Sequence, residues 1–586
     1  MFRACTGIVL VRLGLLFGVC DPIVAIPPSP QSGASFMSRT AMLFAAALLL
    51  ASPVQLDGQS SWNELVDLFG EWREFERPEF IDGVPDYTAT AMARQQQELS
   101  TWKERLWAFD IENWPAEQQI DWHLVRAEMN GLDFDHKIRR PWARDPAFYA
   151  TMYLSESDVP AHEGPVAHGW IDTWIYEYPL SVDDAAELAQ RFGTIPGLLE
   201  QARENLAGSN ARDLWEAGIR SFRGQAADLR AYGEQVAGTS DMLDRALANA
   251  AQASDEFADW VASELPGKTG RSGVGSDAYT WYMHNVHLSP FSWEEQVTLM
   301  RRELARSHSS LRLEENRNRH LPELERIQGP AEYDRRLNES VDLYMAFLER
   351  EEIETIEDWT DAALRAVNGS FTPAEPEEIR NFFQEVIYRD PDAFRPHMHH
   401  WIELARMREA PHQSPIRATP SLSNIYDHRS EGLATGVEEM FMHLGLLDEN
   451  SPRARELVWI MLAQRAARAT SGLMLHGHEF VMEEAVDFAG KWTPRGWLPD
   501  GDLVRGEQHL YLRQPGYGTS YVAGKIQIEQ LLAEEALQNG EAFTIKRFFD
   551  DFYSAGVIPT VLVHWEMTGE KHPILNVGDV QEAPWR

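Results

Sequence analysis

Three histidines stand within four residues of one another in the segment RPHMHHWIELARM: His397, His399 and His400. A second segment, SEGLATGVEEMFMH, follows after a Pro-rich crossing and brings an acidic residue, Glu431, near its start. Neutral imidazole and carboxylate groups are the usual protein ligands of a hydrolytic zinc ion. The sequence therefore makes these four residues candidate metal ligands.

Helical spacing would divide the histidines between two faces. If the first segment is helical, His397 and His400 lie three residues apart and share one face, whereas His399 and Glu403 share another. Either pair could offer two ligands, and Glu431 on a crossing helix could complete the site. The alternative is that the histidines are surface or helix-capping residues and that the acidic residues form a solvated face.

Two further stretches carry polar groups of interest. His476 lies in the triplet His-Gly-His, where it is either a site residue or a buried, hydrogen-bonded histidine. The stretch that begins at Tyr511 contains a Pro-Gly turn, after which Ser520, Tyr521 and Lys525 lie near the predicted start of a helix. Hydroxyl groups and a cation at a helix N-terminus suit a substrate carboxylate or a developing oxyanion. The alternative is a helix entry with the tyrosine packed in the core.

The composition and net charge of the chain exclude several classes of function. The chain has 586 residues, 44% hydrophobic and 25% charged, which is typical of a globular protein. Its formal net charge of −38 argues against nucleic acid or an anionic membrane surface as a partner. The two cysteines, Cys5 and Cys20, lie near the N-terminus, so the rest of the chain has no thiol nucleophile, disulfide or cysteine-ligated zinc.

The first 55 residues are typical of a leader. Two apolar runs occur there, and the second follows Met37 and a short basic start in the manner of a secretory signal. We expect export to the periplasm or beyond, with residues 1–36 an over-extended start. A membrane anchor is the alternative, but both runs are shorter than the roughly 20 residues that a spanning helix needs.

Residues 56–586 read as one large all-α body with a central cleft, in one or two lobes. Apolar residues recur at three- and four-residue spacing through most of the chain, and strand-like alternation is rare. The predicted helices cover much of 62–148, and then 182–206, 212–232, 243–265, 292–313, 330–354, 376–386, 452–469, 482–488, 523–538 and 544–555.

Several of these segments resemble a known family. They are the stretches at 179–206 and 272–296, the run SEGLATGVEEM, and YLRQPGYGTSYVAGKIQI at 511–528. Together they are similar, from roughly Thr88 to the C-terminus, to the bacterial domain of unknown function 885 family, large helical proteins regarded as zinc-dependent peptidases. The resemblance implies zinc, a peptide or small carboxylate substrate, and site roles for His476 and Tyr521.

The chain departs from the family pattern at the expected zinc motif. The family has His-Glu-x-x-Pro-Gly-His-His there, and aligning the paired histidines on His399 and His400 puts Ala393 and Phe394 in place of the first His and Glu. One ligand and the general base are therefore missing. The acidic residue expected four before His476 is also absent, with Gly472 in its place.

Two functions follow. In the first, His397 replaces the lost ligand, and Glu403, Glu438 or Glu439 acts as base in a metal-dependent hydrolase. Tyr521 would then stabilise the oxyanion, and Lys525 or a nearby arginine would hold a substrate carboxylate, with Tyr511 and Ser520 beside it. In the second, the site is catalytically degenerate and binds a peptide or another carboxylate.

Overall fold

The computed structural model describes residues 61–375, 378–448 and 451–576. In these ranges the chain is built almost entirely from helices, which confirms the predicted all-α class. The proposed leader at 1–55 lies outside the described residues, and the central cleft and lobes remain predictions. No helix in the described ranges combines the length and the apolar character needed to cross a membrane.

The N-terminal part consists of eight α-helices and two small strand pairs. The helices are α1 (Trp62–Glu76), α2 (Ala89–Trp107), α3 (Ala116–Phe134), α4 (Pro141–Arg144), α5 (Val182–Gly193), α6 (Ile195–Leu206), α7 (Arg212–Gln235) and α8 (Asp241–Glu264). Strands β1 (Phe80–Ile81) and β2 (Val84–Pro85) pair antiparallel, and β3 (Met152–Tyr153) and β4 (Ile171–Asp172) pair parallel. A loop that spans residues 154–170 joins β3 to β4.

The remaining helices form the larger part of the molecule. They are α9 (Ser276–Asn285), α10 (Trp293–Arg317), α11 (Pro330–Arg350), α12 (Thr360–Ala366), α13 (Phe382–Ile387), α14 (Pro391–Phe394), α15 (His399–Glu409), α16 (Pro415–Ala418), α17 (Asp427–His443), α18 (Arg455–His476), α19 (Met482–Trp492), α20 (Asp502–Arg513), α21 (Tyr517–Asn539), α22 (Ile545–Ser554) and α23 (Thr560–Thr568). A 3₁₀ turn, η5 (Arg395–Met398), leads directly into α15.

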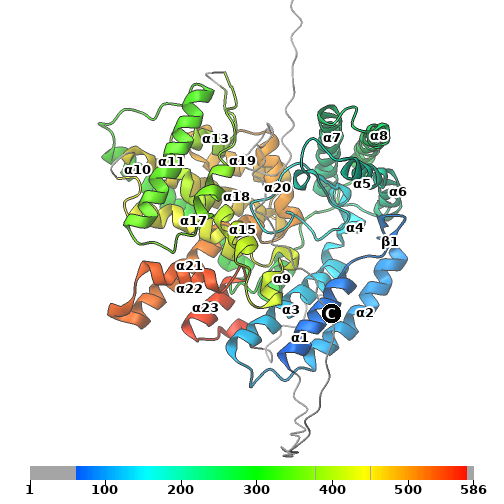
Figure 1. The fold of residues 1–586 in the computed structure, drawn as a ribbon, viewed down its shortest axis with the longest axis horizontal. Coiled ribbons are helices and arrows are strands. Elements are labelled where there is room, and N and C mark those ends of the chain that lie inside the picture. The colour runs from blue at the N-terminus through cyan, green and yellow to red at the C-terminus, as the bar shows by residue number, and fades with distance from the viewer. Residues whose placement is uncertain (1–60, 376–377, 449–450, 577–586) are drawn as a thin grey trace, which may run out of the picture.

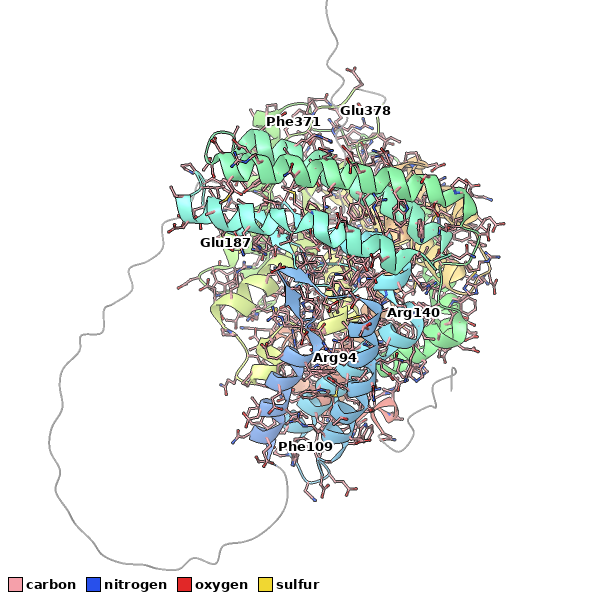
Figure 2. All side chains as sticks on the ribbon, turned by 90° about the vertical axis from the view of Figure 1, so that its right-hand side faces the viewer. Arg94, Phe109, Arg140, Glu187, Phe371 and Glu378 are labelled. Atoms are coloured by element: carbon pink, nitrogen blue, oxygen red, sulfur yellow. The ribbon has the colours of Figure 1, made fainter. Side chains whose placement is uncertain are left out.

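Buried apolar side chains gather in two clusters. The larger one joins α1–α3 to the helices from α9 onward, and the smaller one lies among α5–α8 and the segments around β2 and β4. Figure 1 shows α5–α8 grouped apart from α10–α19, with α1–α3 below them. Figure 2 shows the molecule from the right-hand side of Figure 1, with Glu187 of α5 above and Arg94 of α2 below.

Most predicted helices are present, but some boundaries differ. The stretch predicted as one helix over 182–206 is two helices, because Pro196 lies in the first turn of α6. Proline lacks the backbone N–H that a continuous helix would need there, and its ring crowds the preceding turn. Helix α21 begins at Tyr517 rather than at residue 523, so Tyr521 lies in its second turn and Lys525 in its third, not at its N-terminus.

Helices α17 and α21 cross at two glycines in very close contact. A Cβ atom added to Gly432 would lie 2.5 Å from the Gly524 carbonyl carbon. A Cβ atom added to Gly524 would lie 1.8 Å from the His428 carbonyl oxygen. Only glycine allows this approach, which brings Glu431 of α17 close to the tyrosines of α21.

The substitution Gly524→Ala is therefore expected to destabilise the protein. The methyl group would meet backbone that cannot move aside without separating the helices, and such overpacking costs about 1–3 kcal/mol or more. Gly70 of α1 is the matched control, because a Cβ atom there meets nothing within 4 Å. We expect Gly70→Ala to raise the free energy of unfolding by roughly 0.5–1 kcal/mol. Urea denaturation measures both, and equal stability of the two variants would contradict this account of the crossing.

Candidate metal centre

Three side chains converge at the start of α15 and on α17. His397, His400 and Glu431 each place one potential ligand atom within 4.8 Å of the other two, and all three residues are buried. His397 lies in the 3₁₀ turn η5 and His400 in the first turn of α15, so the predicted three-residue spacing directs both rings toward α17. Figure 1 shows α15, α17 and α18 together near the middle of the larger helical group.

The His397 ring is oriented by a buried ion pair. Its Nδ1 lies 3.1 Å from Glu438 Oε1, and Arg465 donates two hydrogen bonds to the same carboxylate, at 2.5 and 2.7 Å. Burial and the cation of Arg465 lower the pKa of His397 to about 4, so the ring is neutral at physiological pH. Arg465 Nη2 also lies 3.2 Å from Nδ1. In the tautomer that carries its proton on Nδ1 and donates it to Glu438, the lone pair of Nε2 is available, which is the arrangement in which histidine binds zinc.

His400 and Glu431 form the other half of the cluster. His400 Nε2 lies 3.2 Å from Glu431 Oε2, and its Nδ1 lies 3.2 Å from the Ser430 hydroxyl. Burial favours neutral His400, but the charge of Glu431 outweighs it and raises the pKa of the ring. Burial likewise opposes ionisation of Glu431, but the charge and hydrogen bond of His400 hold the pKa of that carboxyl at about 2.

Tyrosines of α21 contact the carboxylate of Glu431. The Tyr517 hydroxyl lies 2.8 Å from Glu431 Oε1 and also 2.8 Å from Glu163 Oε1, in the loop 154–170. Tyr521 donates to the Tyr517 hydroxyl at 3.0 Å. Tyr521 therefore reaches the site through Tyr517 and does not contact Glu431 directly in a hydrogen bond.

His399 points away from the cluster. Its Nδ1 lies 2.8 Å from the Tyr344 hydroxyl and its Nε2 lies 2.9 Å from Glu354 Oε2. Both ring nitrogens are thus engaged with buried partners that belong to the packing between α11 and α15. The structure brings together His397, His400 and Glu431 of the four predicted ligands and leaves His399 outside.

Because His399 and His400 have different contacts, replacing each with alanine should give different results. Replacing His399 (His399→Ala) should leave zinc uptake intact but lower the free energy of unfolding by about 1–3 kcal/mol, because Glu354 loses its buried donor. Replacing His400 (His400→Ala) should abolish zinc uptake. Elemental analysis and urea denaturation of the two variants check this. Loss of zinc from the His399 variant as complete as that from the His400 variant would contradict the assignment.

Each of the carboxylates predicted as a general base is paired with an arginine or lysine side chain. Glu438 holds Arg465 and His397, and Glu403 pairs with Arg429. Glu439 accepts two hydrogen bonds from Arg306 at 2.7 Å each and pairs with Lys525 at 2.9 Å. Lys525 is therefore committed to an ion pair on the α17–α21 contact.

The other predicted site residues lie around the cluster with different partners. His476 is the last residue of α18, and its Nε2 lies 2.9 Å from the Tyr511 carbonyl oxygen. Burial lowers the pKa of this histidine to about 4. Ser520 is buried and donates to the Tyr517 carbonyl oxygen at 2.6 Å. The His476 contact ties α18 to α20, whereas the Ser520 contact lies within α21.

A small cavity opens beside the cluster. It is lined by Asp158, Phe383, His397, Arg468, Glu507, Tyr511, Tyr517 and Tyr521. Arg468 forms a buried ion pair with Glu507, while its Nη2 has no hydrogen-bond partner among the described residues. The Tyr511 hydroxyl is also buried and, in the same ranges, without a partner. Two residues that line the cavity, Arg468 and Tyr511, thus carry hydrogen-bond donors that are unused within the described residues.

Apolar side chains fill the positions of the missing family motif. Ala393 and Phe394 are both buried, and the Phe394 ring packs against Phe383 and His397 at centroid distances of 5.8 and 5.1 Å. A side chain at Gly472 would meet the Tyr511 ring at 3.1 Å, which leaves little room for a carboxylate there.

Four residues around the cluster were not predicted from the sequence: Tyr517, Arg465 and the loop carboxylates Asp158 and Glu163. The spacing of Tyr517 and Tyr521, one helical turn apart, is a signal that could have identified the first. Arg465 carried a weaker signal, as a charged residue that closely follows the apolar run at 457–463. No local sequence pattern marks Asp158 or Glu163 as site residues. Their loop also lies more than two hundred residues from the histidines in sequence.

The fold and the cluster define a large all-α protein with two histidines and a glutamate gathered in its interior. A family model described as bacterial protein of unknown function (DUF885) matches residues 76–384 and 399–567. The chain belongs to this bacterial family. The match is interrupted at 385–398, the segment that contains Ala393, Phe394 and His397.

Solved structures show the same fold. One is a candidate lipoprotein of unknown function from Shewanella oneidensis, with a TM-score of 0.62, 15% identity, and coverage of 86% of this chain and 98% of that one. Another is a candidate lipoprotein from Colwellia psychrerythraea, with a TM-score of 0.59, 13% identity, and coverage of 87% and 99%. Comparison with curated proteins gives no match.

Proposed function

We propose that this protein is an exported zinc-dependent hydrolase that cleaves a peptide or amide bond. The observation that carries the proposal is the convergence of His397, His400 and Glu431 within 4.8 Å in a buried setting. Two imidazoles and one carboxylate form a ligand set of catalytic zinc sites, in which a fourth position stays open for water or substrate.

The surroundings of the three residues fit a zinc ion. Glu438 and Ser430 engage Nδ1 of His397 and His400, which leaves Nε2 of each ring for the metal. Carboxylate and hydroxyl partners of this kind orient metal-binding histidines and raise their basicity. Zinc held there would supply Lewis acidity to a water molecule and to the carbonyl of the substrate.

The cavity has room for about one water molecule, so its lining suits the oxygen of an amide or carboxylate group rather than a whole substrate. The unused donors of Arg468 and Tyr511 suit a carbonyl or carboxylate oxygen, since buried donors without partners are costly and gain most from such a ligand. Arg468 suits the role predicted from the sequence for Lys525 or a nearby arginine. Tyr521 lies at the same cavity, where its hydroxyl could serve a developing oxyanion.

Export is supported by two observations. The leader at 1–55 has the form of a secretory signal, and the two similar solved proteins are candidate lipoproteins. Both point to a protein that works outside the cytoplasm.

A pooled library of synthetic peptides tests the proposal, with products followed by mass spectrometry. The zinc-loaded protein should cleave members of the library. Chelation should abolish cleavage, and zinc should restore it. The His400→Ala variant should be inactive under all these conditions. Cleavage that persists in the chelated protein would refute a metal-dependent hydrolase.

Binding without catalysis is the second candidate, favoured by the apolar residues at Ala393 and Phe394. A degenerate site would still offer Arg468 and Tyr511 to a carboxylate. In that case the peptide library would yield bound members but no cleavage products, and affinity would be unchanged by chelation.

A further inference from the structure

The proposed hydrolase needs a group that accepts a proton from the attacking water. The family position for this base holds Phe394, and the glutamates of α15 and α17 that could replace it are held by arginine or lysine. An ion-paired carboxylate is a poor proton acceptor because its partner stabilises the charged form. The base must come from elsewhere.

The loop 154–170 brings two other carboxylates to the site. Asp158 lines the cavity together with His397, and Glu163 lies 2.8 Å from the Tyr517 hydroxyl. Neither carboxylate makes an ion pair within the described ranges. The Tyr511 hydroxyl, buried and lacking a partner in the same part of the chain, faces the cavity that Asp158 lines.

The loop is fixed on both sides of Glu163. Asn424 donates to the His162 carbonyl oxygen at 3.3 Å, and the Gly164 N–H donates to Gln514 Oε1 at 2.6 Å. Gln514 in turn donates to Asp427 of α17 at 2.7 Å. These hydrogen bonds tie the loop to the start of α17 and the end of α20, so the position of Glu163 is set by the same elements that set Glu431.

A count of protons assigns roles around Tyr517. Its hydroxyl has one proton but lies 2.8 Å from both Glu163 and Glu431. Both contacts are hydrogen bonds only if one of the two carboxyl groups is protonated. Glu431 lies beside His400 and is ionised, so the proton belongs to Glu163. Glu163 then donates to Tyr517, and Tyr517 donates to Glu431.

We propose that the loop 154–170 supplies the proton-transfer groups of the site, with Asp158 as general base and Glu163 as a positioning residue that reprotonates Tyr517. This role rests on the proposed hydrolase function. It places the missing base of the family motif on a segment far away in the sequence.

The proton transfers balance over one turnover. Asp158 accepts a proton from the attacking water as the water oxygen bonds to the carbonyl carbon. As the C–N bond breaks, Tyr517 donates its proton to the leaving nitrogen and receives the proton of Glu163. Asp158 then releases its proton to solvent, and Glu163 takes one from solvent, so one amide and one water become an acid and an amine.

The electrostatics of the two carboxyl groups agree with this division. Burial raises the pKa of Asp158 to about 6, with the nearby charge of His400 acting in the opposite direction. Burial and the charge of Asp158 raise the pKa of Glu163 to about 8. Glu163 thus has the higher pKa of the two, which suits an acid beside a base.

Conservative variants of the zinc-loaded protein test the proposal with the peptide library. We expect Asp158→Asn to lower kcat by roughly 10²–10⁴-fold while zinc content and KM stay near native values. Glu156→Gln is the matched control, because Glu156 lies in the same loop but pairs with Arg408 at the surface, and its kcat should not change.

A second variant tests Glu163 without relying on activity alone. Glu163→Gln keeps a hydrogen-bonding side chain next to Tyr517, and the infrared difference spectrum between native protein and variant should show the loss of one carboxylic acid C=O band. It should also lower kcat, because glutamine cannot reprotonate Tyr517.

The outcomes separate this proposal from the hydrolase proposal. Near-native kcat in both variants of an active protein, or an unchanged infrared band in Glu163→Gln, would overturn the role of the loop alone. A native protein that binds no zinc and cleaves no peptide would overturn the hydrolase function and the loop's catalytic role together.

Discussion

Replacing Glu431 with glutamine (Glu431→Gln) will lower zinc affinity by more than about 100-fold and abolish peptide hydrolysis. Even the outer partners of metal ligands contribute about 10–100-fold, so a ligand should contribute more. The amide retains the shape of the side chain and can still hydrogen-bond Tyr517, so the expected loss reflects the charge and not the packing.

Glu439 is the matched control for this prediction. It lies on the same helix and is also buried, but Arg306 and Lys525 hold its carboxylate. The Glu439→Gln variant should therefore keep its zinc. Isothermal titration of both variants with zinc measures the difference. Equal affinity in the two variants would remove Glu431 from the ligand set.

The largest expected effect on stability follows from replacing Arg465. Arg465 and Glu438 are both almost fully buried and joined by two hydrogen bonds. The Arg465→Met variant leaves a carboxylate buried without its cation, which costs about 3–5 kcal/mol in the free energy of unfolding. Because Glu438 also orients His397, zinc affinity should fall as well.

The control for Arg465 is a surface pair. Arg350 contacts Glu351 at 2.8 Å, and both side chains are largely exposed to solvent. Exposed pairs contribute about 0–1 kcal/mol, so Arg350→Met should have little effect. Urea denaturation compares the two variants. A loss below about 1 kcal/mol for Arg465→Met would mean that the buried pair is not required for the fold.

The sequence predicted the helical body and all three residues of the candidate metal cluster, together with His399, which lies outside it. The spacing of His397 and His400 indicated a shared face, and the ring positions agree because η5 and α15 form one continuous helical run. The same spacing argument could not exclude His399. Its separation from the cluster depends on Tyr344 and Glu354, which are distant in sequence.

The roles of the acidic residues could not be read from local pattern. Glu431, Glu438 and Glu439 are close in sequence and all buried, yet one faces the histidines and the other two are held by cations from other helices. Arg465 and Arg306 pair with Glu438 and Glu439 and leave Glu431 to the histidines. The helical spacing of the glutamates does not predict these ion pairs. The contribution of the loop 154–170 depends in the same way on tertiary contacts.

The zinc content of the purified protein tests the central claim most directly. Elemental analysis would compare the native protein with a variant in which His397 and His400 are both replaced by alanine. We predict one equivalent of zinc in the native protein and none in the double variant, because two of the three proposed ligands are lost. Native protein that takes up no zinc even after incubation with the metal would contradict the account.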